Sequence, residues 1–99
     1  MKILIQVRHY TTARGRRAFP GVMRLHHRLA SAHPGFIALR RLTPVTPKLP
    51  GVIDVVIEFA SMRQIMRWRR SPDHQRMAAA YARCWSKPPE VQFFEVRES

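Results

Sequence analysis

Histidines, a single cysteine and a few hydroxyl side chains are the residues of this chain that could bind a metal ion or attack a substrate. His26 and His27 are adjacent, so in a helix they point to different sides and cannot hold one ion together. Cys84 has no Cys-x-x-Cys partner, and Ser71 is better explained as a helix N-cap than as a nucleophile. The four glycines form no phosphate-binding loop. The sequence therefore predicts no metal site, no nucleotide site and no Ser-His-Asp set.

One short segment, Trp68-Arg-Arg-Ser-Pro-Asp-His74, holds two side chains with more useful chemistry. An imidazole exchanges protons near neutral pH, and an indole N–H donates a hydrogen bond. Both residues also have plain structural explanations, because a tryptophan at helical spacing is typical of a core and a histidine just after an N-cap often packs locally. The surrounding elements must decide between these alternatives.

Alternation of apolar and polar residues predicts four β-strands. Ile3, Ile5 and Val7 share one face of the first strand. The third strand has an unbroken apolar face from Ile53 to Phe59, which must pack on helices. The predicted strands cover residues 1–9, 36–42, 52–59 and 91–96.

Helical periodicity fills the intervals between these strands. A stripe of spacing 3-4 runs over residues 19–30, and Pro20 indicates that the helix starts near Phe19 or is kinked there, after a break at residues 11–15. Ser61 and Gln64 form a capping box, and Ser71-Pro72-Asp73 restarts the second helix. Its stripe extends to Cys84 and Trp85, and the prolines at 88 and 89 end it. The proline-rich residues 43–51 are expected to form a stiff, extended connection.

The order β-α-β-β-α-β over residues 1–99 predicts a single α+β domain of the ferredoxin-like kind, with both helices on one face of a four-stranded antiparallel sheet. The opposite face mixes apolar and ionic side chains, with Arg8 and Arg40 available to Asp54 and Glu58. Such a mixture suits a two-fold sheet-to-sheet interface of a homodimer. The acidic residues at its centre argue against RNA binding by base stacking.

The net charge of +12, with 15 arginines among the 18 basic residues, permits binding to nucleic acid or to acidic ligands. The arginines are spread along the chain, so a solvated basic surface is the favoured interpretation and nucleic-acid binding is the lesser one. The sequence shows no signal-peptide pattern and no apolar run of the length that spans a bilayer, and we therefore expect a cytoplasmic protein without membrane contact.

The Trp68–His74 segment resembles the Trp-x-x-Ser-x-x-His signature of antibiotic biosynthesis monooxygenase domains, and His33-Pro-Gly-Phe36 is similar to the turn before their second strand. The resemblance covers essentially the whole chain. It implies a homodimer, the dimeric α+β barrel, with a pocket between the helices and the sheet of each subunit. It also implies catalytic roles for Trp68 and His74, and substrate contacts for Val7, His26, Ile57 and Tyr81.

The family that this chain resembles also includes haem-degrading oxygenases, whose pattern this chain does not match. That branch places a haem-ligand histidine where this chain has Ala78, and an asparagine where it has Val7. We therefore expect no cofactor. The leading hypothesis is a cofactor-independent monooxygenase that acts on a small aromatic, quinol-like or acidic substrate. The alternatives are a non-enzymatic dimeric module that binds small molecules, and a basic protein that associates with nucleic acid.

Overall fold

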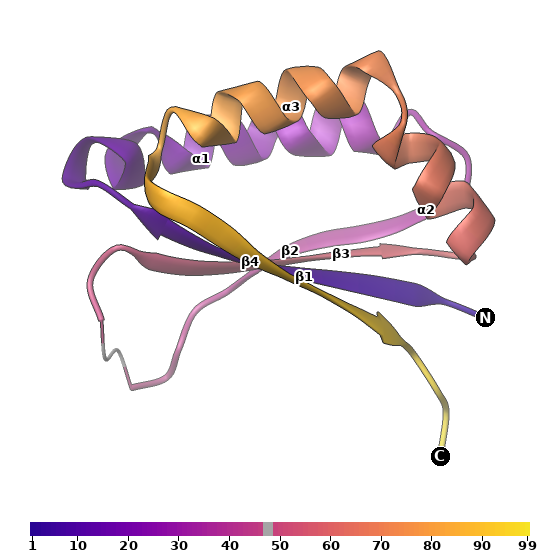
Figure 1. Cartoon of the computed structure of the whole chain (residues 1–99). Coiled ribbons are helices and arrows are strands. Elements are labelled where there is room, and N and C mark those ends of the chain that lie inside the picture. The colour runs from indigo at the N-terminus through magenta and orange to yellow at the C-terminus, as the bar shows by residue number, and fades with distance from the viewer. Residues whose placement is uncertain (47–48) are drawn as a thin grey trace.

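A layer of helices covers one face of a single twisted β-sheet in the computed structural model, which describes residues 1–46 and 49–99 (Figure 1). The helices are α1 (Ala13–Ala30), α2 (Met62–Arg69) and α3 (Pro72–Ala82). The strands are β1 (Ile3–Thr11), β2 (Phe36–Leu42), β3 (Val52–Phe59) and β4 (Trp85–Glu95). Among the described helices, none combines the length and the apolar character needed to cross a membrane.

The sheet order is β2-β3-β1-β4, and each neighbouring pair is antiparallel. β1 and β3 therefore form the centre of the sheet, with Ile5 opposite Ile57 and Val7 opposite Val55. The expected ferredoxin-like α+β fold is confirmed, with the second helix divided into α2 and α3. Residues 47 and 48, in the connection expected to be stiff and extended, lie outside the described residues.

The apolar face of β3 packs on the helices, as its pattern predicts. Ile53, Val55, Ile57 and Phe59 are all buried, and Phe59 is completely inaccessible to solvent. They share a core with Ile3 and Ile5 of β1 and with residues of all three helices. Burying a side chain of this size contributes roughly 1.5–3 kcal/mol of stability, so this face fixes which side of the sheet the helices cover.

The first helix begins earlier than its apolar stripe suggests. α1 starts at Ala13, where the Thr12 hydroxyl accepts a hydrogen bond from the Gly15 N–H at 2.9 Å. The predicted start near Phe19 is therefore wrong, and Pro20 lies inside the helix. Its side chain is exposed to solvent, so the ring needs no space in the core, although it removes one helical N–H donor. The threonine cap nucleates a first turn that carries no apolar stripe of its own.

The last strand also begins earlier than expected. α3 ends at Ala82, and β4 starts at Trp85, so Cys84 and Trp85 do not continue the helix. Pro88 and Pro89 lie within β4 and do not end a helix. β4 pairs only with β1 and forms an edge of the sheet, where a missing N–H can face outward without leaving a neighbouring strand unpaired.

The two predicted caps around α2 and α3 are confirmed. The Ser61 hydroxyl accepts from the Gln64 N–H at 3.2 Å, and the Ser71 hydroxyl accepts from the His74 N–H at 3.1 Å. Ser71 also donates to the Trp68 carbonyl at 2.6 Å. This serine therefore joins the end of α2 to the start of α3 and sets the angle between the two helices.

Candidate functional site

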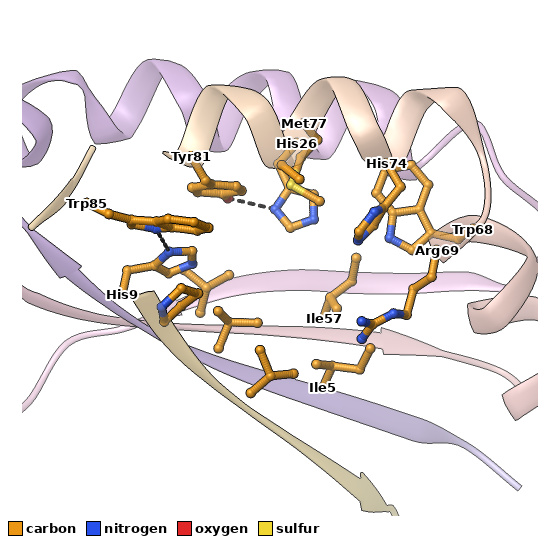
Figure 2. A pocket seen from close by; sticks show the side chains of 15 residues that line it. Ile5, His9, His26, Ile57, Trp68, Arg69, His74, Met77, Tyr81 and Trp85 are labelled. Carbon is orange, nitrogen blue, oxygen red and sulfur yellow. Dashed lines mark hydrogen bonds between the residues drawn. The ribbon is translucent and has the colours of Figure 1, made fainter. Parts of the chain in front are cut away.

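A largely apolar cavity of about 150 Å³ lies between the helix layer and the sheet (Figure 2). Its floor is made by β1, β3 and β4, and its roof by α1, α2 and α3. Ligand sites are usually of this kind, with an apolar lining and a few placed polar groups. All six residues that the resemblance implied for the pocket lie in its wall: Val7, His26, Ile57, Trp68, His74 and Tyr81.

Trp68 and His74 meet at one end of the cavity. Trp68 is in the last turn of α2 and only 1% exposed, and His74 is in the first turn of α3. Their ring centroids are 5.4 Å apart in an edge-to-face arrangement. Burial, and then the charge of Arg69, lower the pKa of His74. The imidazole is therefore neutral at physiological pH and can accept a proton.

A second histidine, His33, also packs against Trp68. The His33 ring contacts the indole edge to face at 4.9 Å between centroids. Asp73 holds that ring, since its Oδ2 lies 3.0 Å from His33 Nε2. The turn at 33–36 thus has a direct structural role in placing the tryptophan.

His26 and Tyr81 form the middle of the cavity roof. The Tyr81 hydroxyl lies 2.7 Å from His26 Nδ1 and 3.1 Å from the sulfur of Met23. Burial lowers the pKa of His26 to about 3, so its ring is neutral. Its Nε2 is fully buried and has no hydrogen-bond partner among the described residues.

His9 and Trp85 close the other end, and neither was among the expected site residues. The Trp85 indole N–H donates to His9 Nδ1 at 3.0 Å, and the His9 ring stacks on Tyr81 with centroids 4.6 Å apart. Burial lowers the pKa of His9 to about 4. The strand alternation already contained the signal for His9, because it continues the face of Ile3, Ile5 and Val7. Trp85 was assigned to the stripe of the second helix and expected in the core and rim, whereas it begins β4.

Arg69 was also missed, and it is the one cationic side chain in the cavity wall described above. It extends from the end of α2 toward the sheet (Figure 2). Its guanidinium carbon lies 5.0 Å from the centroid of the Phe93 ring. Among the described residues it forms no ion pair with a carboxylate.

Neither a metal centre nor a haem site is indicated by the cavity residues. Within residues 1–46 and 49–99, no group of three or more His, Cys, Asp or Glu side chains could hold a metal ion. Ala78 lines the cavity and offers only a methyl group at the position that the resemblance implied for a haem ligand.

No protein-family model matches the sequence, and no curated protein matches it either. Solved structures do match. A variant of SnoaB, a cofactor-independent oxygenase from Streptomyces nogalater, is 14% identical and has a TM-score of 0.83, covering 99% of this chain and 95% of that one. Rv0793 from Mycobacterium tuberculosis is 13% identical with a TM-score of 0.82, covering 100% and 98%.

A third structure carries the name of the family that the sequence resembles. It is a protein from Bordetella bronchiseptica provisionally described as an antibiotic biosynthesis monooxygenase, 15% identical with a TM-score of 0.83 over 98% of both chains. At these identities the similarity establishes the fold. The subunit fold implied by the resemblance of the Trp68–His74 segment is thereby confirmed, and this chain has the fold of the antibiotic biosynthesis monooxygenases.

Proposed function

We propose that this protein is a cofactor-independent monooxygenase that acts on a small aromatic or quinol-like substrate. The observation that carries the proposal is the meeting of Trp68 and a neutral His74 in the wall of one largely apolar cavity. The fold shared with a cofactor-independent oxygenase supports it.

The proposed reaction needs a base, an anion-stabilising donor and a dry space. His74 removes a proton from the phenolic or quinol-like substrate, and the resulting anion supplies electrons to oxygen. The Trp68 indole N–H stabilises the developing charge. In the keto form of the substrate the reacting ring carbon is a CH₂ group. Its reaction with O₂ breaks the O–O bond, leaves one oxygen on that carbon as a carbonyl and releases the other with the two hydrogens as water, so the substrate itself provides all of the reducing equivalents. Apolar walls keep water from protonating the reactive anion.

The protein is further proposed to form a homodimer through the sheet face that the helices leave uncovered. Val56 at the centre of that face is 7% exposed, whereas Leu42 and Phe94 are 44% and 38% exposed. Arg8 pairs with Asp54 at 2.9 Å, which is one of the pairings expected there. Arg40 and Glu58 have no ion-pair partner among the described residues. A partner sheet would cover the apolar side chains and bring opposite charges to both.

Oxygen consumption by the metal-free protein tests the activity, with a panel of hydroquinones, hydroxybenzoates, naphthols and anthrones as substrates. Trp68→Phe keeps an aromatic ring but loses the N–H, and His74→Ala loses the base. We expect each to lower kcat by about 10²-fold or more. His27→Ala changes an exposed histidine outside the cavity and should leave kcat unchanged.

Two results would contradict this proposal. Turnover that survives in both Trp68→Phe and His74→Ala would remove these residues from the chemistry. Saturable ligand binding without oxygen consumption would instead identify the protein as a small-molecule-binding module.

A further inference from the structure

The cavity contains a polar atom that the protein itself leaves unsatisfied. His26 is 6% exposed, and its Nε2 is buried without a partner among the described residues. Figure 2 shows that one ring nitrogen is bonded to Tyr81 and that the other is turned away from it, on the side where Trp68 and His74 lie. Buried polar atoms are nearly always hydrogen bonded, and leaving one unpaired is costly. This nitrogen therefore indicates a group that a ligand would supply.

A hydroxyl group suits the His26 nitrogen in either tautomer. If the Tyr81 hydroxyl donates to Nδ1, Nε2 carries the proton and donates. If Tyr81 donates to the Met23 sulfur instead, Nδ1 carries the proton and Nε2 accepts. A ligand hydroxyl can both donate and accept, so it fits both arrangements.

Arg69 supplies a second point of recognition at the same cavity. Its guanidinium has no carboxylate partner among the described residues, although its side chain is partly buried. The three histidines of the wall are neutral, because burial lowers the pKa of His9, His26 and His74. Arg69 thus gives the cavity its positive charge, and a guanidinium binds carboxylates and similar anions by paired hydrogen bonds.

The space between these two points is small and apolar. A cavity of about 150 Å³ accommodates roughly one benzene-sized ring. Val7 and Ile57 line the floor, so the centre of the site favours the body of an aromatic ring over a polar chain.

We propose that the cavity binds single-ring hydroxyaromatic anions, with the anionic group on Arg69 and the hydroxyl group on His26 Nε2. This assignment rests on the proposed function, since it names the substrate class of the same cavity. Polycyclic phenols would extend beyond the cavity and would lose one of the two contacts.

Binding of simple benzoates, measured by calorimetry under nitrogen, tests the assignment without any turnover. The probes are 4-hydroxybenzoate and 3-hydroxybenzoate, with benzoate lacking the hydroxyl and the corresponding hydroxybenzamides lacking the charge. The only two tryptophans, Trp68 and Trp85, both line the cavity. Their two indole N–H signals in NMR spectra therefore report whether a probe occupies it.

We expect at least one hydroxybenzoate to bind about tenfold more tightly than benzoate and than its own amide. Arg69→Gln should remove the preference for the anion over the amide, whereas Arg67→Gln, an exposed arginine on the same helix, should keep it. His26→Leu should remove the preference for the hydroxyl. If the leucine variant fails to fold, His26→Asn replaces it in the same binding measurement. His27→Leu is its matched control.

Equal affinities of a hydroxybenzoate and its amide would overturn the assignment, as would an equal loss in Arg67→Gln and Arg69→Gln. These outcomes are distinct from failure of the oxygenase proposal. Selective binding without oxygen consumption would refute the activity and keep the ligand class, whereas turnover of neutral phenols alone would keep the activity and refute the ligand class.

Discussion

The indole N–H of Trp85 donates to Nδ1 of His9 across 3.0 Å and joins the start of β4 to the end of β1 at one end of the cavity. Because Nδ1 accepts this bond, the neutral imidazole carries its proton on Nε2. The contact therefore fixes the tautomer of a histidine in the cavity wall, and it does so with a residue 76 positions away in sequence.

Replacing Trp85 by phenylalanine should raise the pKa of His9 from its value of about 4. The indole bond stabilises only the neutral ring, so its loss favours the protonated form, by about one pKa unit. NMR titration of the histidine ring protons between about pH 5 and pH 7.5 should show His9 beginning to titrate in the variant but not in the wild type. Trp68→Phe, which leaves this bond in place, should not shift His9; a shift of equal size there would contradict the prediction.

Stability should fall as the pH drops below the ordinary pKa of histidine. His9 and His26 have folded pKa values of about 4 and about 3, below the usual 6.5. Both rings stay neutral in the folded protein while they charge in the unfolded chain. The stabilisation is therefore complete above pH 6.5 and is lost progressively toward the folded values. Between about pH 7.5 and pH 5, each ring should lower the free energy of unfolding by about 2 kcal/mol.

Urea unfolding across that range measures the loss of stability. His26→Gln should remove about half of the fall due to the two rings. His27→Gln, which changes an exposed neighbour, should retain all of it. An unchanged slope in His26→Gln would show that the His26 ring binds protons equally in the folded and the unfolded protein.

Two glycines of α1 should respond to alanine in opposite directions. A Cβ at Gly15 would lie 2.2 Å from the carbonyl oxygen of Cys84, and this backbone oxygen cannot move aside as a flexible side chain could. Gly15→Ala should therefore destabilise the protein by about 1–3 kcal/mol or more. A Cβ at Gly21 meets only the Arg24 side chain at 3.5 Å, so Gly21→Ala should stabilise the helix by roughly 0.5–1 kcal/mol. Equilibrium unfolding of both variants measures these changes. Equal changes in the free energy of unfolding would contradict the close approach of α1 to the backbone just before β4.

A charge at the centre of the uncovered sheet face should break the proposed dimer. Val56 lies on β3, opposite Gln6 on one neighbouring strand, β1, and opposite Arg40 on the other, β2. Val56→Lys would place an unpaired cation against the partner sheet, at a cost of several kcal/mol. Light scattering at micromolar concentration should give a dimer for the wild type and a monomer for the variant. Ala79→Lys, on the exposed side of α3, should remain dimeric. A monomeric wild type would refute the sheet-to-sheet interface.

The third strand was predictable because apolar and polar residues alternate along it and the apolar ones are buried. β2 and β3 were predicted with the ends that the structure has, and Ser61 and Ser71 marked the starts of α2 and α3. The start of α1 was not predicted correctly, because glycine and threonine have low helix propensity and the first turn has no apolar stripe. Its glycine is required by the close approach of Cys84, a contact distant in sequence.

The candidate site was predictable where a segment resembled a known family, and less so elsewhere. Trp68 and His74 lie in one such segment and do share the cavity. Trp85 was missed because prolines at 88 and 89 were interpreted as the end of a helix, and the edge position that tolerates them is a property of the whole sheet. Arg69 was not distinguished among 15 arginines, since its place in the wall depends on the angle between α2 and the sheet.

Those same two prolines affect how one molecule can meet another at the β4 edge. Neither Pro88 nor Pro89 has an N–H group, and both lie where the pairing of β4 with β1 shifts its register, so the first half of that edge is a poor template for an added strand. Edge-to-edge pairing of sheets, the first step of many aggregates, is therefore disfavoured along the first half of β4. At this edge it would have to begin in the proline-free half from Val91 to Glu95.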